Sequence, residues 1–126
     1  MNTRILIVED ELLVASDLEA RLTQMGHQVL GIATTGEEAI ALAEQHRPDV
    51  VLMDMQLAGK MNGQEAANII QTARPVPVIY LTAFVGMLAP DTKLRGRGNA
   101  FLSKPFSTFE IAEGLKAALS GGGGAE

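Results

Sequence analysis

The chain contains 126 residues, of which 47% are hydrophobic and 20% are charged, and its formal net charge is −5. This length is typical of a single domain, and the composition is that of a folded protein rather than a disordered one. The absence of cysteine excludes disulfides, cysteine-ligated zinc and a thiol nucleophile, and the acidic balance without a broad basic stripe argues against direct binding of nucleic acid.

Short apolar runs rich in β-branched residues recur along the chain, at residues 5–8, 29–32, 50–53, 78–81 and 100–102. The first, third and fourth runs are continuously apolar, which is typical of strands that are buried on both faces. Amphipathic helical patterns separate the runs. This alternation of strands and helices predicts an α/β fold with a doubly wound, five-stranded parallel sheet and helices on both of its faces.

The helical segments are predicted by apolar residues at helical spacing. The stripes are Val14, Leu18, Leu22 and Met25 in the first, Ala66, Ile69, Ile70 and Ala73 in another, and Ile111, Leu115, Ala118 and Leu119 in the last. Capping-box patterns predict three helix starts, at Thr35 with Glu38, at Ser107 with Glu110, and in a looser form at Asn62 with Glu65.

Two segments depart from this regular pattern. Residues 84–98 should hold the fourth helix, but Pro90 and three glycines interrupt them, so we expect a short, broken or displaced helix there. The glycine-rich residues 121–126 are expected to form a flexible tail after a domain that spans residues 1–120.

Polar residues follow the predicted strands where each strand ends. They are Glu9, Asp10 and Glu11 after the first strand, Asp54 after the third, Thr82 at the end of the fourth, and Lys104 after the fifth. Because ligands bind at the carboxyl ends of the strands in an open parallel sheet, we expect these side chains to form one site. Crowded carboxylates repel one another, and Mg²⁺ would relieve this repulsion. Glu11 is expected only to favour the first turn of the following helix.

The sequence resembles the receiver domains of bacterial two-component response regulators. The residues that carry the resemblance are Ile5 to Glu11, Val51 to Leu57 with Gly63, Leu81-Thr82-Ala83, and Leu102 to Phe106. The resemblance runs from about residue 3 to residue 119. It implies a flavodoxin-like sheet with strand order 2-1-3-4-5.

The resemblance also implies a role for each residue of the site. Asp54 would accept a phosphoryl group from the phosphohistidine of a histidine kinase or of a histidine phosphotransfer protein. Asp10, Asp54 and the backbone carbonyl of Gln56 would ligate Mg²⁺, and Glu9 would act through water. The phosphoryl oxygens would contact Lys104, the Thr82 hydroxyl and the Ala83 amide. A cis peptide bond is expected between Lys104 and Pro105.

A switch would follow from the added charge of the phosphoryl group. The resemblance implies that Thr82 moves toward this group and that the aromatic ring of Phe101 then turns inward. Partner binding would change as a result. A second hypothesis is that the face formed by the fourth helix, fifth strand and fifth helix, with Phe84, Val85, Met87 and Leu88 nearby, forms a homodimer or an output contact.

Several alternatives remain at this stage. The start at Met1 favours a cytoplasmic single-domain regulator, and the alternative is a receiver module of a hybrid kinase or a multidomain regulator. The longest mainly apolar stretch, residues 75–90, is too short to span a membrane. A flavodoxin-like cofactor binder would share the fold, but the acidic first loop would repel phosphate. A haloacid-dehalogenase-type phosphatase would need an acid where Gln56 stands, so no activity beyond uptake and hydrolysis of the chain's own phosphoryl group is expected.

Overall fold

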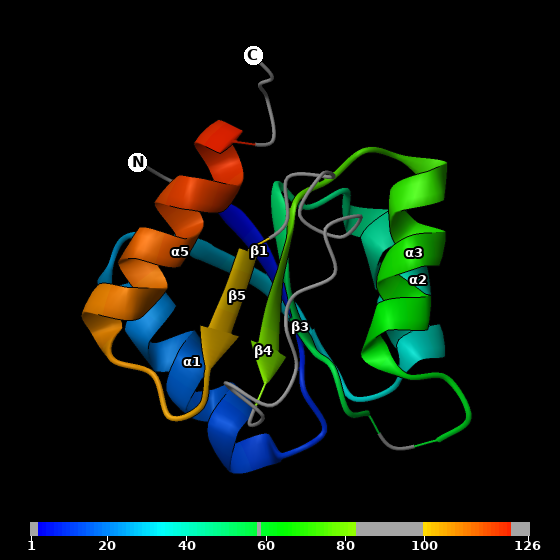
Figure 1. Ribbon diagram of the computed structural model, residues 1–126, viewed down its shortest axis with the longest axis horizontal. Helices are drawn as coiled ribbons and strands as arrows, with labels where there is room; N and C mark the ends of the chain where they lie inside the picture. The colour runs from blue at the N-terminus through cyan, green and yellow to red at the C-terminus, as the bar shows by residue number, and fades with distance from the viewer. Residues whose placement is uncertain (1–2, 58, 83–99, 122–126) are drawn as a thin grey trace.

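A computed structural model describes residues 3–57, 59–82 and 100–121 of the chain. These residues form a five-stranded sheet with the order β2-β1-β3-β4-β5 (Figure 1). The elements are β1 (Arg4–Val8), α1 (Leu12–Gln24), β2 (Gln28–Ala33), α2 (Gly36–His46), β3 (Val50–Asp54), α3 (Gly63–Ala73), β4 (Val78–Thr82), β5 (Ala100–Ser103) and α5 (Thr108–Gly121). All neighbouring strands pair in parallel, which confirms the predicted fold class. The expected irregular helix at residues 84–98 lies outside the described residues.

The central strand β1 shows why its apolar run is continuous. Ile5, Leu6, Ile7 and Val8 are fully buried, and β1 pairs with β2 on one side and β3 on the other. Because successive side chains of a strand point to opposite faces, Ile5 and Ile7 join one hydrophobic cluster while Leu6 and Val8 join another. Both faces of the sheet are therefore covered by helices.

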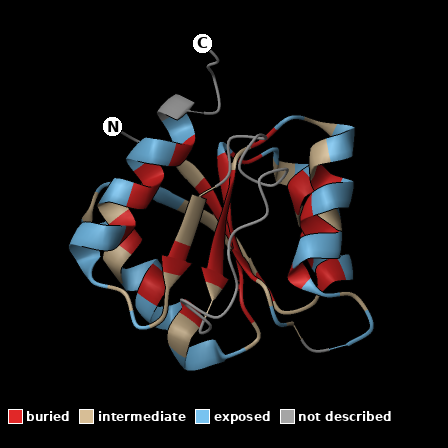
Figure 2. Cartoon of the chain, in the orientation of Figure 1, coloured by how far each residue is buried: buried red, intermediate tan, exposed pale blue. Residues whose placement is uncertain are grey.

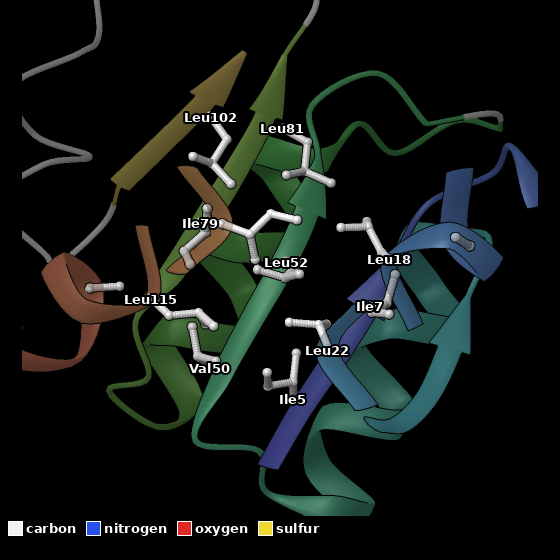
Figure 3. Packing of buried hydrophobic residues seen from close by; sticks show 13 residues of the cluster. Ile5, Ile7, Leu18, Leu22, Val50, Leu52, Ile79, Leu81, Leu102 and Leu115 are labelled. Atoms are coloured by element: carbon white, nitrogen blue, oxygen red, sulfur yellow. The ribbon is translucent and has the colours of Figure 1, made fainter. Parts of the chain in front are cut away.

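Helices α1 and α5 cover one face of the sheet, and α2 and α3 cover the other (Figure 1; Figure 2). Figure 3 shows the cluster beneath α1 and α5, in which Leu18 and Leu22 from α1 and Leu115 from α5 meet side chains from the sheet. Two residues of the predicted stripes are not core residues, because Ile69 is 46% exposed and Leu119 is 40% exposed.

The predicted helix starts are confirmed, with one difference in detail. Asn62 forms a complete capping box with Glu65, and the Ser107 hydroxyl likewise accepts from the backbone N–H of Glu110 while Glu110 accepts from that of Ser107. At α2, Thr35 accepts from the backbone N–H of Glu38, but the Glu38 carboxylate accepts from the backbone N–H of Thr34.

The last helix extends one residue into the expected tail. Helix α5 ends at Gly121, and the remaining residues of the predicted tail, 122–126, lie outside the described part of the chain. Among the described helices, none combines the length and the apolar character that crossing a bilayer would require.

Candidate functional site

The carboxyl ends of β1 and β3 bring three carboxylates together. Glu9 and Asp10 directly follow β1, and Asp54 is the last residue of β3. Since β1 and β3 are neighbours in the sheet, these side chains converge, and each offers an oxygen within 4.8 Å of the others. Glu9 is fully buried and Asp54 is only 5% exposed. The predicted convergence of Glu9, Asp10 and Asp54 is therefore confirmed.

Lys104 follows β5 and reaches into this group of carboxylates. Its Nζ lies 3.1 Å from Glu9 Oε1 and 3.6 Å from Asp54 Oδ2. The contact with Glu9 is an ion pair that is short but poorly aligned for a hydrogen bond. The structure thus places the predicted ammonium beside the predicted phosphoacceptor. The peptide bond between Lys104 and Pro105 is cis, as expected.

The position of Glu9 alters its protonation. Burial, followed by a hydrogen bond with Asp54, raises the pKa of Glu9 to about 7, although Lys104 and the backbone N–H of Glu11 act in the opposite direction. Burial alone would lower the pKa of Lys104, but its contact with Glu9 and the charges of Asp54, Glu9 and Glu11 outweigh burial and raise that pKa. Several carboxylates thus stabilise the charged form of Lys104, but its single positive charge cannot neutralise all of them.

This excess of negative charge fits a divalent cation. Hard cations such as Mg²⁺ take oxygen ligands from a small number of carboxylates, carbonyls and waters. Glu9, Asp10 and Asp54 provide such oxygens close together, and Lys104 offers a single positive charge to this group of three carboxyl groups. The donor set is therefore consistent with a magnesium site.

The loop after Asp54 is held against the end of β3. The backbone N–H of Gln56 donates to Asp54 Oδ1 at 3.0 Å, and the N–H of Gly63 donates to the carbonyl of Met55 at 3.1 Å. A Cβ atom on Gly63 would lie 2.0 Å from the backbone oxygen of Asp54. Gly63 thus lets the start of α3 approach the end of β3 more closely than any other residue would.

Of the remaining predicted residues, two lie on β4 and β5 and one lies outside the described residues. Thr82 ends β4, and its carbonyl accepts from the backbone N–H of Lys104 at 2.8 Å. Phe101 lies on β5, where its ring stacks on Tyr80 with the centroids 5.3 Å apart. Ala83 lies outside the described residues.

The structure corrects the interpretation of Glu11. This residue precedes α1 as its N-cap, and the first turn of α1 contains no acidic residue. Its side chain makes no capping hydrogen bond and instead places Oε1 3.8 Å from Lys104 Nζ. Sequence reasoning missed this contact because Glu11 follows β1 and Lys104 follows β5, which lie far apart along the chain and are not neighbours in the sheet.

Comparison with known proteins identifies the family. The model of the response regulator receiver domain matches residues 5–116. The chain belongs to this family. Receivers are modules of two-component signalling, and the sheet order and the acidic group described above agree with this assignment.

Similar receivers occur in longer proteins. The phyllosphere-induced regulator PhyR of Methylorubrum extorquens is 42% identical over 123 residues, which cover 94% of this chain and 44% of that protein. The transcriptional regulatory protein PdtaR of Mycobacterium tuberculosis is 37% identical over 117 residues, which cover 93% of this chain and 57% of that protein. The chain thus spans about half the length of these curated relatives.

A separately studied receiver shows the same fold. The solution structure of the receiver domain of the Erythrobacter litoralis PhyR response regulator superposes with a TM-score of 0.81 at 29% identity. The match covers 99% of this chain and 95% of that one. The likeness therefore extends over the whole receiver rather than over a shared fragment.

Proposed function

We propose that this receiver is a phosphorylation-dependent signalling switch that accepts a phosphoryl group on Asp54. One observation carries the proposal: Asp54 is a buried carboxylate in a group with Glu9 and Asp10, and the ammonium of Lys104 lies 3.6 Å from it. The match of residues 5–116 to the receiver family also supports Asp54 as the acceptor.

The donor would be a phosphohistidine of a histidine kinase or of a phosphotransfer protein. A carboxylate oxygen of Asp54 forms the bond to phosphorus, the phosphorus–nitrogen bond of the donor breaks, and the departing imidazole takes up a proton. The product is an acyl phosphate on Asp54. The receiver then catalyses only the uptake and the loss of its own phosphoryl group.

The residues of the site divide this work between them. Lys104 balances negative charge on the phosphoryl oxygens, and the Thr82 hydroxyl and the Ala83 amide donate hydrogen bonds to them. Asp10, Asp54 and the backbone carbonyl of Gln56 would hold Mg²⁺, with Glu9 acting through water. When bound, Mg²⁺ neutralises charge that develops on the transferred group.

The partner that delivers the phosphoryl group must dock around the carboxyl edge of the sheet. Three large apolar side chains are exposed there: Leu12 and Leu13 at the start of α1 are 64% and 88% exposed, and Phe109 in the first turn of α5 is 72% exposed. A hydrogen bond from Arg21 Nη1 to the carbonyl of Phe106 joins α1 to the segment before α5. Large apolar side chains exposed beside a site are candidates for contact with a protein partner.

The acceptor assignment is tested by mass spectrometry after incubation with a small phosphodonor and Mg²⁺. We expect the wild-type chain to gain the mass of one phosphoryl group, and Asp54→Ala to gain none. Asp49→Ala, which removes an exposed carboxylate at the opposite end of β3, should be phosphorylated like the wild type. Phosphorylation of Asp54→Ala to the wild-type extent would refute the assignment.

A further inference from the structure

The start of α1 differs from the starts of the other described helices. Thr35, Asn62 and Ser107 each use a side-chain oxygen to cap the helix that follows. The N-cap of α1 is Glu11, and its side chain makes no capping hydrogen bond. A cap normally stabilises a helix, so α1 lacks a contribution that the other described helices have. Local rules of this kind are broken most often at functional sites.

The side chain of Glu11 is directed toward the site instead. Its Oε1 lies 3.8 Å from Lys104 Nζ, and the side chain is 68% exposed. The backbone N–H of Glu11 donates to Glu9 Oε2 at 3.1 Å, which holds this residue beside the buried carboxylates. Glu11 therefore lies at the rim of the site and faces the ammonium.

Lys104 is shared between three carboxylates that differ in exposure. Glu9 is fully buried at 3.1 Å, and Asp54 at 3.6 Å is the residue that becomes phosphorylated in the proposed function. Glu11 is the exposed member of the three, so its side chain can move away without opening the core. The phosphoryl group on Asp54 would offer Lys104 new oxygens in competition with Glu11.

From this arrangement we infer that Glu11 is a positioning residue that holds Lys104 at the rim of the unphosphorylated site and restrains phosphoryl uptake. The inference rests on the proposed function of Asp54. Without the Glu11 charge, Lys104 keeps its contacts with Glu9 and Asp54, but the incoming phosphoryl group competes with one carboxylate fewer for the ammonium. Because exposed ion pairs are weak, we expect a change of about two- to fivefold in rate rather than a larger one. High salt screens such a pair and should reduce the difference.

The test compares the rates at which acetyl phosphate with Mg²⁺ phosphorylates the full chain. Glu11→Gln should react about two- to fivefold faster than the wild type. Glu19→Gln is the matched control, because it removes the same charge from an exposed position on α1, about two turns further along the helix. This control should react at the wild-type rate. Equal rates for Glu11→Gln and Glu19→Gln would overturn the inference.

A second variant separates the contact from the charge alone. Glu11→Asp keeps the charge, but its shorter side chain would cap α1 instead of reaching Lys104. It should react like Glu11→Gln. A wild-type rate for Glu11→Asp would mean that charge near the site acts without this contact, and the inference would be wrong.

A third measurement does not depend on phosphorylation. The NMR signals of the Lys104 ε-methylene group should shift in Glu11→Gln and stay unchanged in Glu19→Gln. If the wild-type chain takes up no phosphoryl group on Asp54, the proposed function fails and this inference fails with it. If the wild type is phosphorylated while the Lys104 signals do not respond to Glu11→Gln, only this inference fails.

Discussion

A single ammonium group balances several carboxylates at the carboxyl edge of the sheet, and the stability of the protein should reflect this. Glu9 is fully buried, and its pKa is raised from 4.5 to about 7. Between these two values the folded state holds a proton that the unfolded state has released. Stability contributed by this group is therefore present below pH 4.5 and is lost as the pH rises toward 7.

We expect the free energy of unfolding without divalent cations to be lower at pH 7.5 than at pH 5, by no more than about 3 kcal/mol. Urea denaturation in the presence of a chelator measures this difference. Glu9→Gln, which cannot ionise, should show a smaller change between the two pH values. Added Mg²⁺ should recover part of the loss at pH 7.5, because a cation favours the ionised carboxylate. A wild-type protein that is equally stable at both pH values would contradict this account.

Gly63 offers a second test at the level of one residue. A Cβ atom at this position would lie 2.0 Å from the oxygen and 2.9 Å from the carbon of the Asp54 carbonyl group. These are backbone atoms, so the clash cannot be relieved by turning a side chain. Gly63→Ala should lower the free energy of unfolding by about 2–3 kcal/mol in urea denaturation, and it should displace the Asp54 loop.

The matched control for this variant is Gly31→Ala in β2. A Cβ atom there would meet only Leu42 Cδ1 at 3.7 Å, which is an ordinary contact. We expect its effect on stability to be less than about 1 kcal/mol. If Gly63→Ala and Gly31→Ala lower the free energy of unfolding equally, the close approach of α3 to β3 is not the reason that position 63 requires glycine.

At the level of secondary structure, the end of α2 contains a conformation that is unfavourable for its residue. Arg47 is the C-cap of α2 and has φ 50° and ψ 65°, the left-handed conformation. It is the one residue other than glycine with positive φ in the described part of the chain. Its carbonyl accepts a hydrogen bond from Arg4 Nη1 at 2.9 Å, and this bond uses only the backbone of Arg47.

Replacing this arginine with glycine should therefore stabilise the protein. We expect Arg47→Gly to raise the free energy of unfolding by about 0.5–1 kcal/mol, since glycine adopts positive φ without steric cost. Arg47→Ala keeps the Cβ atom and should not stabilise, so it separates backbone strain from loss of the charge. If alanine and glycine have the same effect in thermal denaturation, strain at this position is not the cause.

Periodicity predicted the helices and strands well, but it could not decide which apolar side chains are buried. Ile69 fits the apolar stripe of α3, yet Ala66, Ala67 and Ile70 occupy the buried face, and Ile69 is 46% exposed. A stripe gives the direction of the buried face only to within about one residue, because neighbouring positions on a helix differ by 100°. The register is set by contacts with the sheet and with α2, which the local sequence does not contain.

At the level of the whole molecule, the site likewise contains contacts that the sequence predicts and contacts that it does not. The convergence of Glu9, Asp10 and Asp54 could be predicted because it follows from sheet topology alone. The contact of Glu11 with Lys104 depends on the path of two side chains across the edge of the sheet, and the position after β1 suggested only a favourable helix charge. Sheet topology thus predicts which strand ends lie together, whereas the contacts of an individual side chain depend on the packing around it.

The exposed apolar side chains beside the site lead to a prediction about the whole surface. Leu13 is 88% exposed, so Leu13→Ser should leave the free energy of unfolding within about 0.5 kcal/mol of the wild type. It should also be phosphorylated normally by acetyl phosphate, which needs no docking surface. Transfer from a protein phosphodonor should become slower, because the partner loses an apolar contact near Asp54.

Ile69→Ser is the control for this surface. It removes an exposed apolar side chain from α3, which covers the opposite face of the sheet from α1 (Figure 1). The rate of phosphoryl transfer from the protein donor to Ile69→Ser should equal that to the wild type. If Leu13→Ser and Ile69→Ser slow the transfer equally, the exposed apolar side chains at the start of α1 do not form part of the docking surface for the donor.

The stacked pair on β4 and β5 has a practical consequence. Tyr80 is the only tyrosine of a chain that has no tryptophan, and its ring is fully buried against Phe101. When the protein is excited at wavelengths that phenylalanine does not absorb, its fluorescence therefore comes from Tyr80 alone. A rearrangement of the neighbouring ring would change the intensity or anisotropy of that emission. Tyr80 can thus serve as an intrinsic fluorescent probe, and the proposed switch can be tested without attaching a label.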